Sequence, residues 1–220
     1  MTELGKRRRD RLSRARLYLV CDAGFGAGGV RAALEGGADI VQLREKDADD
    51  RAVLAAAADF RQAAEEYGAL FILNDRPDLA RAAGADGVHV GQDDASPAEA
   101  RRLAGADALV GLSTHSDAQV DAAQRAGVDY FCVGPVHATP TKAGRPAVGL
   151  APLRRAAAGA RLPWFAIGGL NAGNLGPVLA AGARRIVVVR AITEAADPEA
   201  AARRLRATLD AATEAGVGAA

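Results

Sequence analysis

The sequence predicts an α/β protein, a single compact (β/α)8 fold of the TIM-barrel type. The first observation behind this prediction is that eight short apolar runs of strand length recur along the 220 residues. The second is that an alanine-rich stretch long enough for a helix follows each run, and strands that alternate with helices form parallel sheets. We expect the strands within residues 17–20, 37–41, 70–73, 84–88, 105–109, 127–131, 164–167 and 182–186.

The junctions between helices and strands carry a repeated tripeptide. Gly-Ala-Asp, or a close variant, begins five of these runs, and glycine readily takes the left-handed conformation that ends a helix. Helix starts agree with this register. Ser96 and Ser116 each begin a capping box, and Asp197 precedes a proline at a first helical position. The repeats start at Gly37, Gly84, Gly105, Gly127 and Gly182.

An open doubly wound sheet is the alternative fold for this alternation. Polar residues cluster directly after the expected strands. In a closed barrel this is the face on which active sites are built from the loops between strands and helices. The position of the polar residues therefore favours the barrel.

Charge is balanced overall and uneven locally. The chain has 28 basic and 27 acidic residues, but residues 1–16 hold seven basic side chains against two acidic ones. Clustered like charges are commonly disordered. We therefore expect residues 1–16 to be a flexible basic extension and residues 17–220 to be the catalytic barrel domain. A contact of this extension with nucleic acid is the less favoured alternative.

The sequence shows no sign of export or membrane insertion. Its apolar stretches are far shorter than the ~20 residues of a membrane-spanning helix, and its basic start lacks the apolar core of a secretory signal. Cys21 and Cys132 lie in apolar runs without the spacing of a zinc site, so we expect them to be buried. These features predict a cytoplasmic protein.

Lysine is rare, which draws attention to the end of the second strand. Only three of the 28 basic residues are lysines, and one of them ends the segment 42–46. Strand alternation places Gln42, Arg44 and Lys46 on one side and Leu43 and Glu45 on the other. If the first side faces the barrel mouth, two cations and an amide form an anion site suited to a phosphate or diphosphate. A pairing of Arg44 with Glu45 would instead give a solvated salt bridge.

Carboxylates follow two neighbouring strands. Asp75 ends the third strand, and Asp93 and Asp94 follow the fourth. Carboxylates that face each other beside a diphosphate are natural ligands of Mg²⁺, and we expect the pair to be Asp75 with Asp94, with Asp93 as the alternative to the latter. The structural alternative makes Asp75 a helix N-cap ahead of Pro77.

The later strand ends suggest a lid and a phosphate site. Residues 134–145 form the longest polar loop and the best candidate for a mobile lid. After the seventh strand, Gly168 and Gly169 let backbone N–H groups approach an anion, and the tip of the eighth strand at Val189 and Arg190 lies beside them. This is the phosphate position of many barrels.

Taken in order, these segments resemble the thiamine-phosphate synthase family from about residue 17 to residue 209. The resemblance is carried by QLREK, ILNDR, GVHVGQDD, GLSTHS, GPVHATPTK and AIGGLN, in that order. It implies a Mg²⁺-dependent transferase that joins hydroxymethylpyrimidine diphosphate to thiazole phosphate, releasing diphosphate and forming thiamine phosphate. In the family the reaction is dissociative: diphosphate leaves first, and the thiazole nitrogen captures a pyrimidine carbocation.

The resemblance also implies a role for each matched residue, with Lys142 and Ser113 as the catalytic ones. Mg²⁺ would be held by Asp75 and Asp94. Ser113 would lie against the pyrimidine, whose diphosphate end would be held by Gln42, Leu43, Arg44, Glu45, Lys46, Asn74 and Lys142. The thiazole phosphate would be received by Thr139, Thr141, Gly169, Val189 and Arg190. Arg190 departs from the family, in which many members have serine.

Two other functions stay open. A thiazole tautomerase is a similar barrel, and His115 lies where that relative has a catalytic histidine, but its likeness lacks the second acidic site that Asp94 provides here. A non-catalytic sensor of phosphate ligands is the other alternative. The expected partners are small-molecule substrates rather than nucleic acid or membrane, and the Ala- and Arg-rich outer helices leave a homo-oligomer open.

Overall fold

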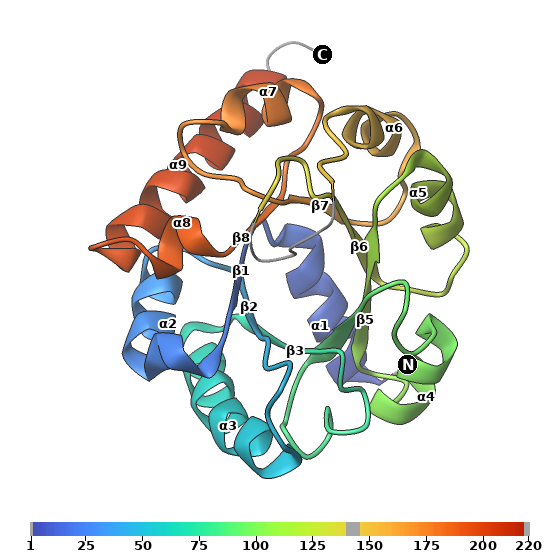
Figure 1. Cartoon of the computed structure of the whole chain (residues 1–220), viewed down its shortest axis with the longest axis vertical. Helices are drawn as coiled ribbons and strands as arrows, with labels where there is room; N and C mark the ends of the chain where they lie inside the picture. Colours follow the sequence, from blue (N-terminus) through green and yellow to red (C-terminus); the bar gives the residue numbers. More distant parts are fainter. Residues whose placement is uncertain (1, 140–145, 218–220) are drawn as a thin grey trace.

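The computed structural model describes residues 2–139 and 146–217 and shows a closed parallel barrel. Eight strands pair in chain order, and β8 closes the ring onto β1 (Figure 1). This confirms the predicted barrel and excludes the open sheet. The strands are β1 (Leu17–Cys21), β2 (Ile40–Leu43), β3 (Leu70–Asn74), β4 (Gly87–Val90), β5 (Leu109–Thr114), β6 (Tyr130–Val133), β7 (Trp164–Ile167) and β8 (Ile186–Val188).

Helices surround the strands, as Figure 1 shows. The capping residues expected from the sequence begin their helices: the Ser96 side chain accepts a hydrogen bond from the Glu99 amide, and Ser116 accepts one from Gln119. The helices are α1 (Glu3–Arg14), the short 3-10 helix η1 (Ala23–Phe25), α2 (Gly26–Glu35), α3 (Asp50–Tyr67), α4 (Pro97–Ala104), α5 (Asp117–Ala123), α6 (Ala151–Gly159), α7 (Leu175–Ala180), α8 (Arg190–Thr193) and α9 (Pro198–Val217).

One strand-to-strand connection differs from the expectation of a helix after every strand. Residues 75–86, all of which the structure describes, form hydrogen-bonded turns between β3 and β4. This connection is short, and Pro77 and Gly84 lie near its two ends. Gly84 takes a positive φ of 64°, a conformation that glycine adopts readily and that ends the turns ahead of β4.

The core is divided between the two faces of the barrel wall. One cluster of apolar side chains lies between the strands and the outer helices. The other fills the inside of the barrel and includes Tyr18, Tyr130 and Phe165, which pack edge to face or tilted at centroid distances of 5.5–6.1 Å. Cys21 and Cys132 are buried and free, as expected. The interior is therefore a packed core below the mouth.

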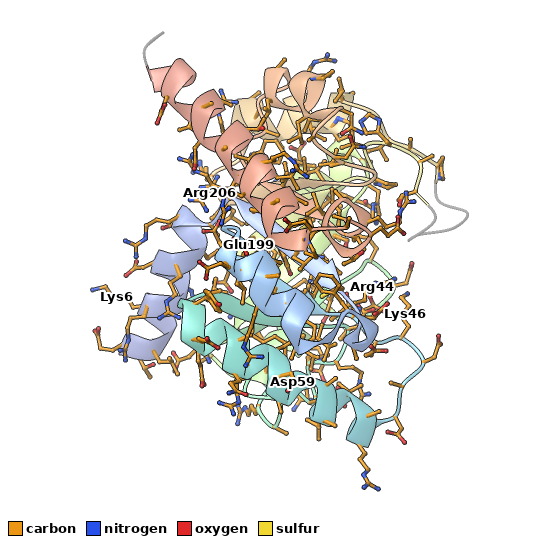
Figure 2. The ribbon with its side chains drawn as sticks, turned by 90° about the vertical axis from the view of Figure 1, so that its left-hand side faces the viewer. Lys6, Arg44, Lys46, Asp59, Glu199 and Arg206 are labelled. Atoms are coloured by element: carbon orange, nitrogen blue, oxygen red, sulfur yellow. The ribbon has the colours of Figure 1, made fainter. Side chains whose placement is uncertain are left out.

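The basic N-terminal segment, which the sequence predicts to be a flexible extension, forms the helix α1 in the structure. Helix α1 packs against one end of the barrel, where Leu12 is 2% exposed and belongs to the interior core. Figure 2 shows Lys6 of this helix at one end of the molecule and Arg44 and Lys46 at the other. The helix thus closes the end opposite the expected active site.

The aspartates of the repeated tripeptide explain why this basic helix is ordered. Asp86 and Asp129 lie at the starts of strands and pair with Arg8 at 2.8 Å and Arg9 at 2.7 Å. Asp107 accepts hydrogen bonds from the backbone and hydroxyl of Thr2. Two of the positive charges of α1, those of Arg8 and Arg9, are therefore compensated by acidic groups far away in the sequence, and local charge counting missed this.

The described helices were compared with the requirements of a membrane-spanning segment. Across residues 2–139 and 146–217, no helix combines the length and the apolar character that crossing a bilayer requires.

Candidate active site

A cavity of about 730 Å³ opens at the carboxyl ends of the strands. Its volume lies within the ~300–1,000 Å³ range of small-molecule sites. Every strand-end segment singled out in the sequence contributes to its wall. Among its lining residues are Gln42, Arg44, Lys46, Asn74, Asp75, His89, Asp93, Asp94, Ser113, His115, Thr139, Gly168, Gly169, Val189 and Arg190.

The end of β2 presents alternate side chains to the cavity. Gln42, Arg44 and Lys46 line it, as the two-residue period predicts. Leu43 is fully buried in the outer core, and the Glu45 carboxylate accepts a hydrogen bond from the Ala23 amide at 2.6 Å. The side chains of Leu43 and Glu45 therefore do not line the cavity, because a strand sends neighbouring residues to opposite faces.

Asp75 and Asp94 come together at the mouth from the ends of β3 and β4. Burial of Asp75, its hydrogen bond with Asp94 and the repulsion between the two carboxyls raise the pKa of Asp75 from 3.8 to about 6. A hydrogen bond from Asn74 and the charge of Lys46 act in the opposite direction. The two acids are thus close enough to compete for one proton.

The local backbone supports this placement of Asp75. Its φ of 57° lies in the left-handed region, which few non-glycine residues adopt, although Asp tolerates it better than most. No helix follows it within the described turn segment 75–86, so the N-cap alternative fails. Asp94 is fixed separately, since its carboxylate accepts a hydrogen bond from the Gly91 amide at 2.7 Å.

The donor set suits Mg²⁺ that arrives with a phosphate ligand. Mg²⁺ is usually bound by one or two carboxylates together with substrate phosphates and water. Among the residues that the structure describes, no cluster of three or more His, Cys, Asp or Glu side chains forms a complete metal cage. Two crowded carboxylates beside Arg44 and Lys46 fit a metal that a diphosphate would help to hold.

Sequence reasoning missed a set of polar side chains at the floor of the cavity. Ser113, which was expected at the site, lies with its hydroxyl 3.0 Å from Nε2 of His89. Nδ1 of His89 lies 3.3 Å from the Tyr130 hydroxyl, which in turn is 3.0 Å from that of Tyr18. A histidine and two tyrosines at inward positions of strands were the available signal, but their orientation depends on strand register.

The remaining expected residues lie on the later loops. Thr139, Gly169, Val189 and Arg190 line the cavity, and Arg190 also approaches Glu194 at 3.9 Å. His115 lines the cavity as well, and its Nδ1 contacts the Gly134 carbonyl oxygen. Thr141 and Lys142 lie outside the described residues, as does the second half of the expected lid, residues 140–145.

Comparisons with known proteins match this arrangement. A family model described as thiamine monophosphate synthase matches residues 17–192. The chain belongs to this family. It is 54% identical to the thiamine-phosphate synthase of Thermobifida fusca, with 94% of this chain and 98% of the relative covered. Against that of Mycobacterium tuberculosis the identity is 53%, with 92% and 98% covered.

A solved structure agrees. The thiamine phosphate pyrophosphorylase from Pyrococcus furiosus superposes with a TM-score of 0.83 at 34% identity, covering 93% of this chain and 98% of that one. A 3-hexulose-6-phosphate synthase with a TM-score of 0.66 and 23% identity shares the fold alone. The family resemblance and the barrel predicted from the sequence are thereby confirmed.

Proposed function

We propose that the protein is a Mg²⁺-dependent thiamine-phosphate synthase. It transfers the hydroxymethylpyrimidine group from its diphosphate to the nitrogen of thiazole phosphate, with diphosphate as the leaving group. The observation that carries this proposal is the cavity in which the cations Arg44 and Lys46 lie beside the carboxylate pair Asp75 and Asp94. The names of the family and of its similar relatives support the same activity.

The cations and the acids have different roles at the diphosphate: the cations would bind its oxygens, and the acids would hold its Mg²⁺. Arg44 can form a bidentate, charge-assisted contact with phosphate oxygens, and Lys46 supplies a second, more flexible charge. Bound Mg²⁺, held by Asp75 and Asp94, would neutralise negative charge that develops on the leaving diphosphate. We assign Lys142 the same task from the loop that follows β6.

The pyrimidine would be oriented at the floor of the cavity. Gln42, Asn74 and Ser113 are each 7% exposed or less, so their polar groups are held in fixed positions close to the mouth. A dissociative reaction needs a neutralised leaving group and an oriented acceptor more than it needs a protein nucleophile. The floor residues supply this orientation.

The thiazole phosphate would enter from the opposite side. Gly168 and Gly169 have φ values of 110° and 64°, so glycine is needed to turn the backbone where it faces the cavity. We place the phosphate there, with Thr139, Thr141 and the tip of β8 at Val189 and Arg190 around it. Diphosphate and phosphate would then lie on separate strand ends, with the reacting atoms between them.

The rival functions have less support. A tautomerase would act on the thiazole phosphate alone and would not need the acidic pair, although His115 at the cavity wall keeps that reaction testable. A sensor that uses the basic segment to reach nucleic acid loses much of its basis, because Arg8 and Arg9 are paired with barrel aspartates. The proposed enzyme acts in the cytoplasm on small molecules.

The test is an assay of both products with purified protein and the two substrates. We expect thiamine phosphate and diphosphate to appear in equal amounts, and neither substrate alone to be consumed. Isomerised thiazole phosphate without coupling would replace the synthase by the tautomerase. Binding of both ligands without any turnover would favour the non-catalytic sensor of phosphate ligands.

A further inference from the structure

A continuous series of hydrogen-bonded polar side chains crosses the inside of the barrel at the floor of the cavity. It runs from Gln42 on β2 through Tyr18 on β1, Tyr130 on β6 and His89 on β4 to Ser113 on β5. All five are between 0% and 7% exposed. Buried polar groups are costly unless they are hydrogen-bonded, so such a chain stabilises one arrangement of its hydrogens.

The strand register explains how the two ring systems meet. His89, Gly111 and Tyr130 are paired in register across β4, β5 and β6. A Cβ on Gly111 would lie 2.6 Å from Nδ1 of His89 and would also collide with the Tyr130 ring. Glycine at the middle position therefore leaves the room in which His89 reaches the Tyr130 hydroxyl, and Phe165 packs edge to face against Tyr130 from the other side.

The hydrogen bonds between these side chains have a defined donor-to-acceptor order. The Gln42 amide nitrogen donates to the Tyr18 hydroxyl, since an amide nitrogen has no acceptor capacity. Tyr18 then donates to Tyr130, and Tyr130 donates to Nδ1 of His89. Any other order leaves the hydrogen of Tyr18 or that of Tyr130 without an acceptor among these five residues. Burial raises the pKa of both tyrosines well above the ordinary value, so each phenol keeps the hydrogen that it donates.

This direction determines the state of His89. Nδ1 accepts from Tyr130, so the ring hydrogen of the neutral imidazole is on Nε2. Nε2 then donates to the oxygen of Ser113 across 3.0 Å. Because that oxygen accepts from Nε2, the hydroxyl hydrogen of Ser113 is not the one shared with His89, and Ser113 itself lines the cavity.

We propose that His89 is a positioning residue: the chain from Gln42 holds it in the neutral Nε2–H form, and it thereby makes Ser113 a hydrogen-bond donor to a ring nitrogen of the bound pyrimidine. This inference rests on the proposed function for the identity of the ligand. A neutral imidazole also keeps a positive charge away from the carbocation that the dissociative reaction forms. In this proposal His89 acts through Ser113 and not on the reacting atoms.

The first arm of the test observes the tautomer without any turnover. In protein labelled with ¹⁵N-histidine, we expect the His89 ring to show a protonated Nε2 and an unprotonated Nδ1, assigned by the loss of the signals in His89→Gln. Tyr130→Phe keeps the ring and removes the donor, so Nδ1–H should become populated. An Nδ1–H tautomer in the wild-type protein, or no change in Tyr130→Phe, would overturn the proposal.

The second arm separates positioning from packing. The loss of one oriented hydrogen bond of about 1.4 kcal/mol lowers a rate or binding constant about tenfold. In Tyr130→Phe we therefore expect kcat/KM for the pyrimidine diphosphate to fall about tenfold, and KM for thiazole phosphate to stay unchanged. His89→Gln, which can donate from the Nε2 position, should retain more activity than His89→Leu. The control Phe165→Leu should lower stability without this substrate-selective effect.

The outcomes distinguish the two proposals. Equal changes in the kinetic constants for both substrates, or equal losses of activity in His89→Gln and His89→Leu, would overturn the proposal. The hydrogen-bonded side chains would then have a structural role only. An inactive wild-type protein with the expected tautomer would contradict the proposed function and leave the state of His89 established.

Discussion

Asp75 shows at the scale of one residue how the site is prepared for a cation. Its backbone is in the left-handed region, and its carboxyl is partly buried beside Asp94. Both features cost stability in the free protein, and they persist at functional sites where the ligand compensates for them. The cost should therefore be measurable as a change of stability with pH.

We predict that Asp75→Asn stabilises the metal-free protein while it abolishes most activity. The pKa of Asp75 is raised to about 6 in the folded state, above its ordinary value of 3.8. The folded protein thus holds this proton more tightly than the unfolded chain, and ionisation lowers stability as pH rises through this interval. The melting temperature of Asp75→Asn should exceed that of the wild type near pH 7, with a smaller difference near pH 4.

The control for this measurement is Asp59→Asn, an exposed position on α3, which should show no such pH-dependent difference. A difference in melting temperature between Asp75→Asn and the wild type that stays constant with pH would point to the backbone preference of Asn for the left-handed region. It would refute the explanation that the ionised Asp75 carboxylate destabilises the protein.

Arg44 gives a second prediction at this scale. A hydrogen bond to a charged group contributes about 1.5–3 kcal/mol, so Arg44→Ala should raise KM for the pyrimidine diphosphate on the order of 10- to 100-fold. Steady-state kinetics with each substrate varied in turn would measure this. Arg51→Ala, an exposed arginine on α3, is the matched control. An unchanged KM would remove Arg44 from the diphosphate site.

At the scale of elements, α1 shows what the sequence could and could not reveal. The strands and most helices follow from local signals: apolar runs, glycine stops and capping boxes. The order of α1 depends on partners such as Asp86 and Asp129, which lie 78 and 120 residues away from Arg8 and Arg9. Such pairing becomes visible only once the strand starts are gathered at one end of the barrel.

We predict graded losses of stability at this end. Asp129 is 10% exposed, pairs with both Arg9 and Arg101 at 2.7 Å and accepts from the Val110 amide. Arg9→Ala leaves the other partners, so its cost should be about 1 kcal/mol, whereas Asp129→Ala leaves buried donors unsatisfied and should cost about 2–4 kcal/mol. Urea unfolding would measure both.

The exposed Arg7 on the same helix provides the control, since Arg7→Ala should leave unfolding nearly unchanged. Values of kcat/KM should remain close to the wild type in all three variants below their melting temperatures, because α1 lies at the end of the barrel away from the cavity (Figure 2). Equal costs for Arg7→Ala and Arg9→Ala would show that the ion pair with Asp129 contributes nothing specific.

The candidate site was predictable in its outline for a similar reason. Parallel strands bring all their carboxyl ends to one face, so polar residues such as Arg44, Asp75 and Ser113 had to converge there. The inward direction of Gln42, Arg44 and Lys46 follows from the strand period. The contact of His89 with Tyr130 was not predictable, because it depends on a register in which Gly111 separates them.

The whole molecule separates its tasks between two ends. One end is closed by α1 and held by ion pairs, and the other carries the cavity with its cations and acids. Stability and chemistry are thus carried by different loops, an arrangement that barrels share. We propose that the acids at the open end hold the Mg²⁺ on which the transfer depends.

The most direct measurement of this claim is the initial rate of thiamine phosphate formation across a Mg²⁺ titration, for the wild type and Asp94→Asn. We predict no product without Mg²⁺, saturation in the wild type, and in Asp94→Asn a curve shifted to higher Mg²⁺ with a maximal rate lower on the order of 100-fold. Wild-type product formation in excess chelator, or identical titration curves for the two proteins, would contradict the account.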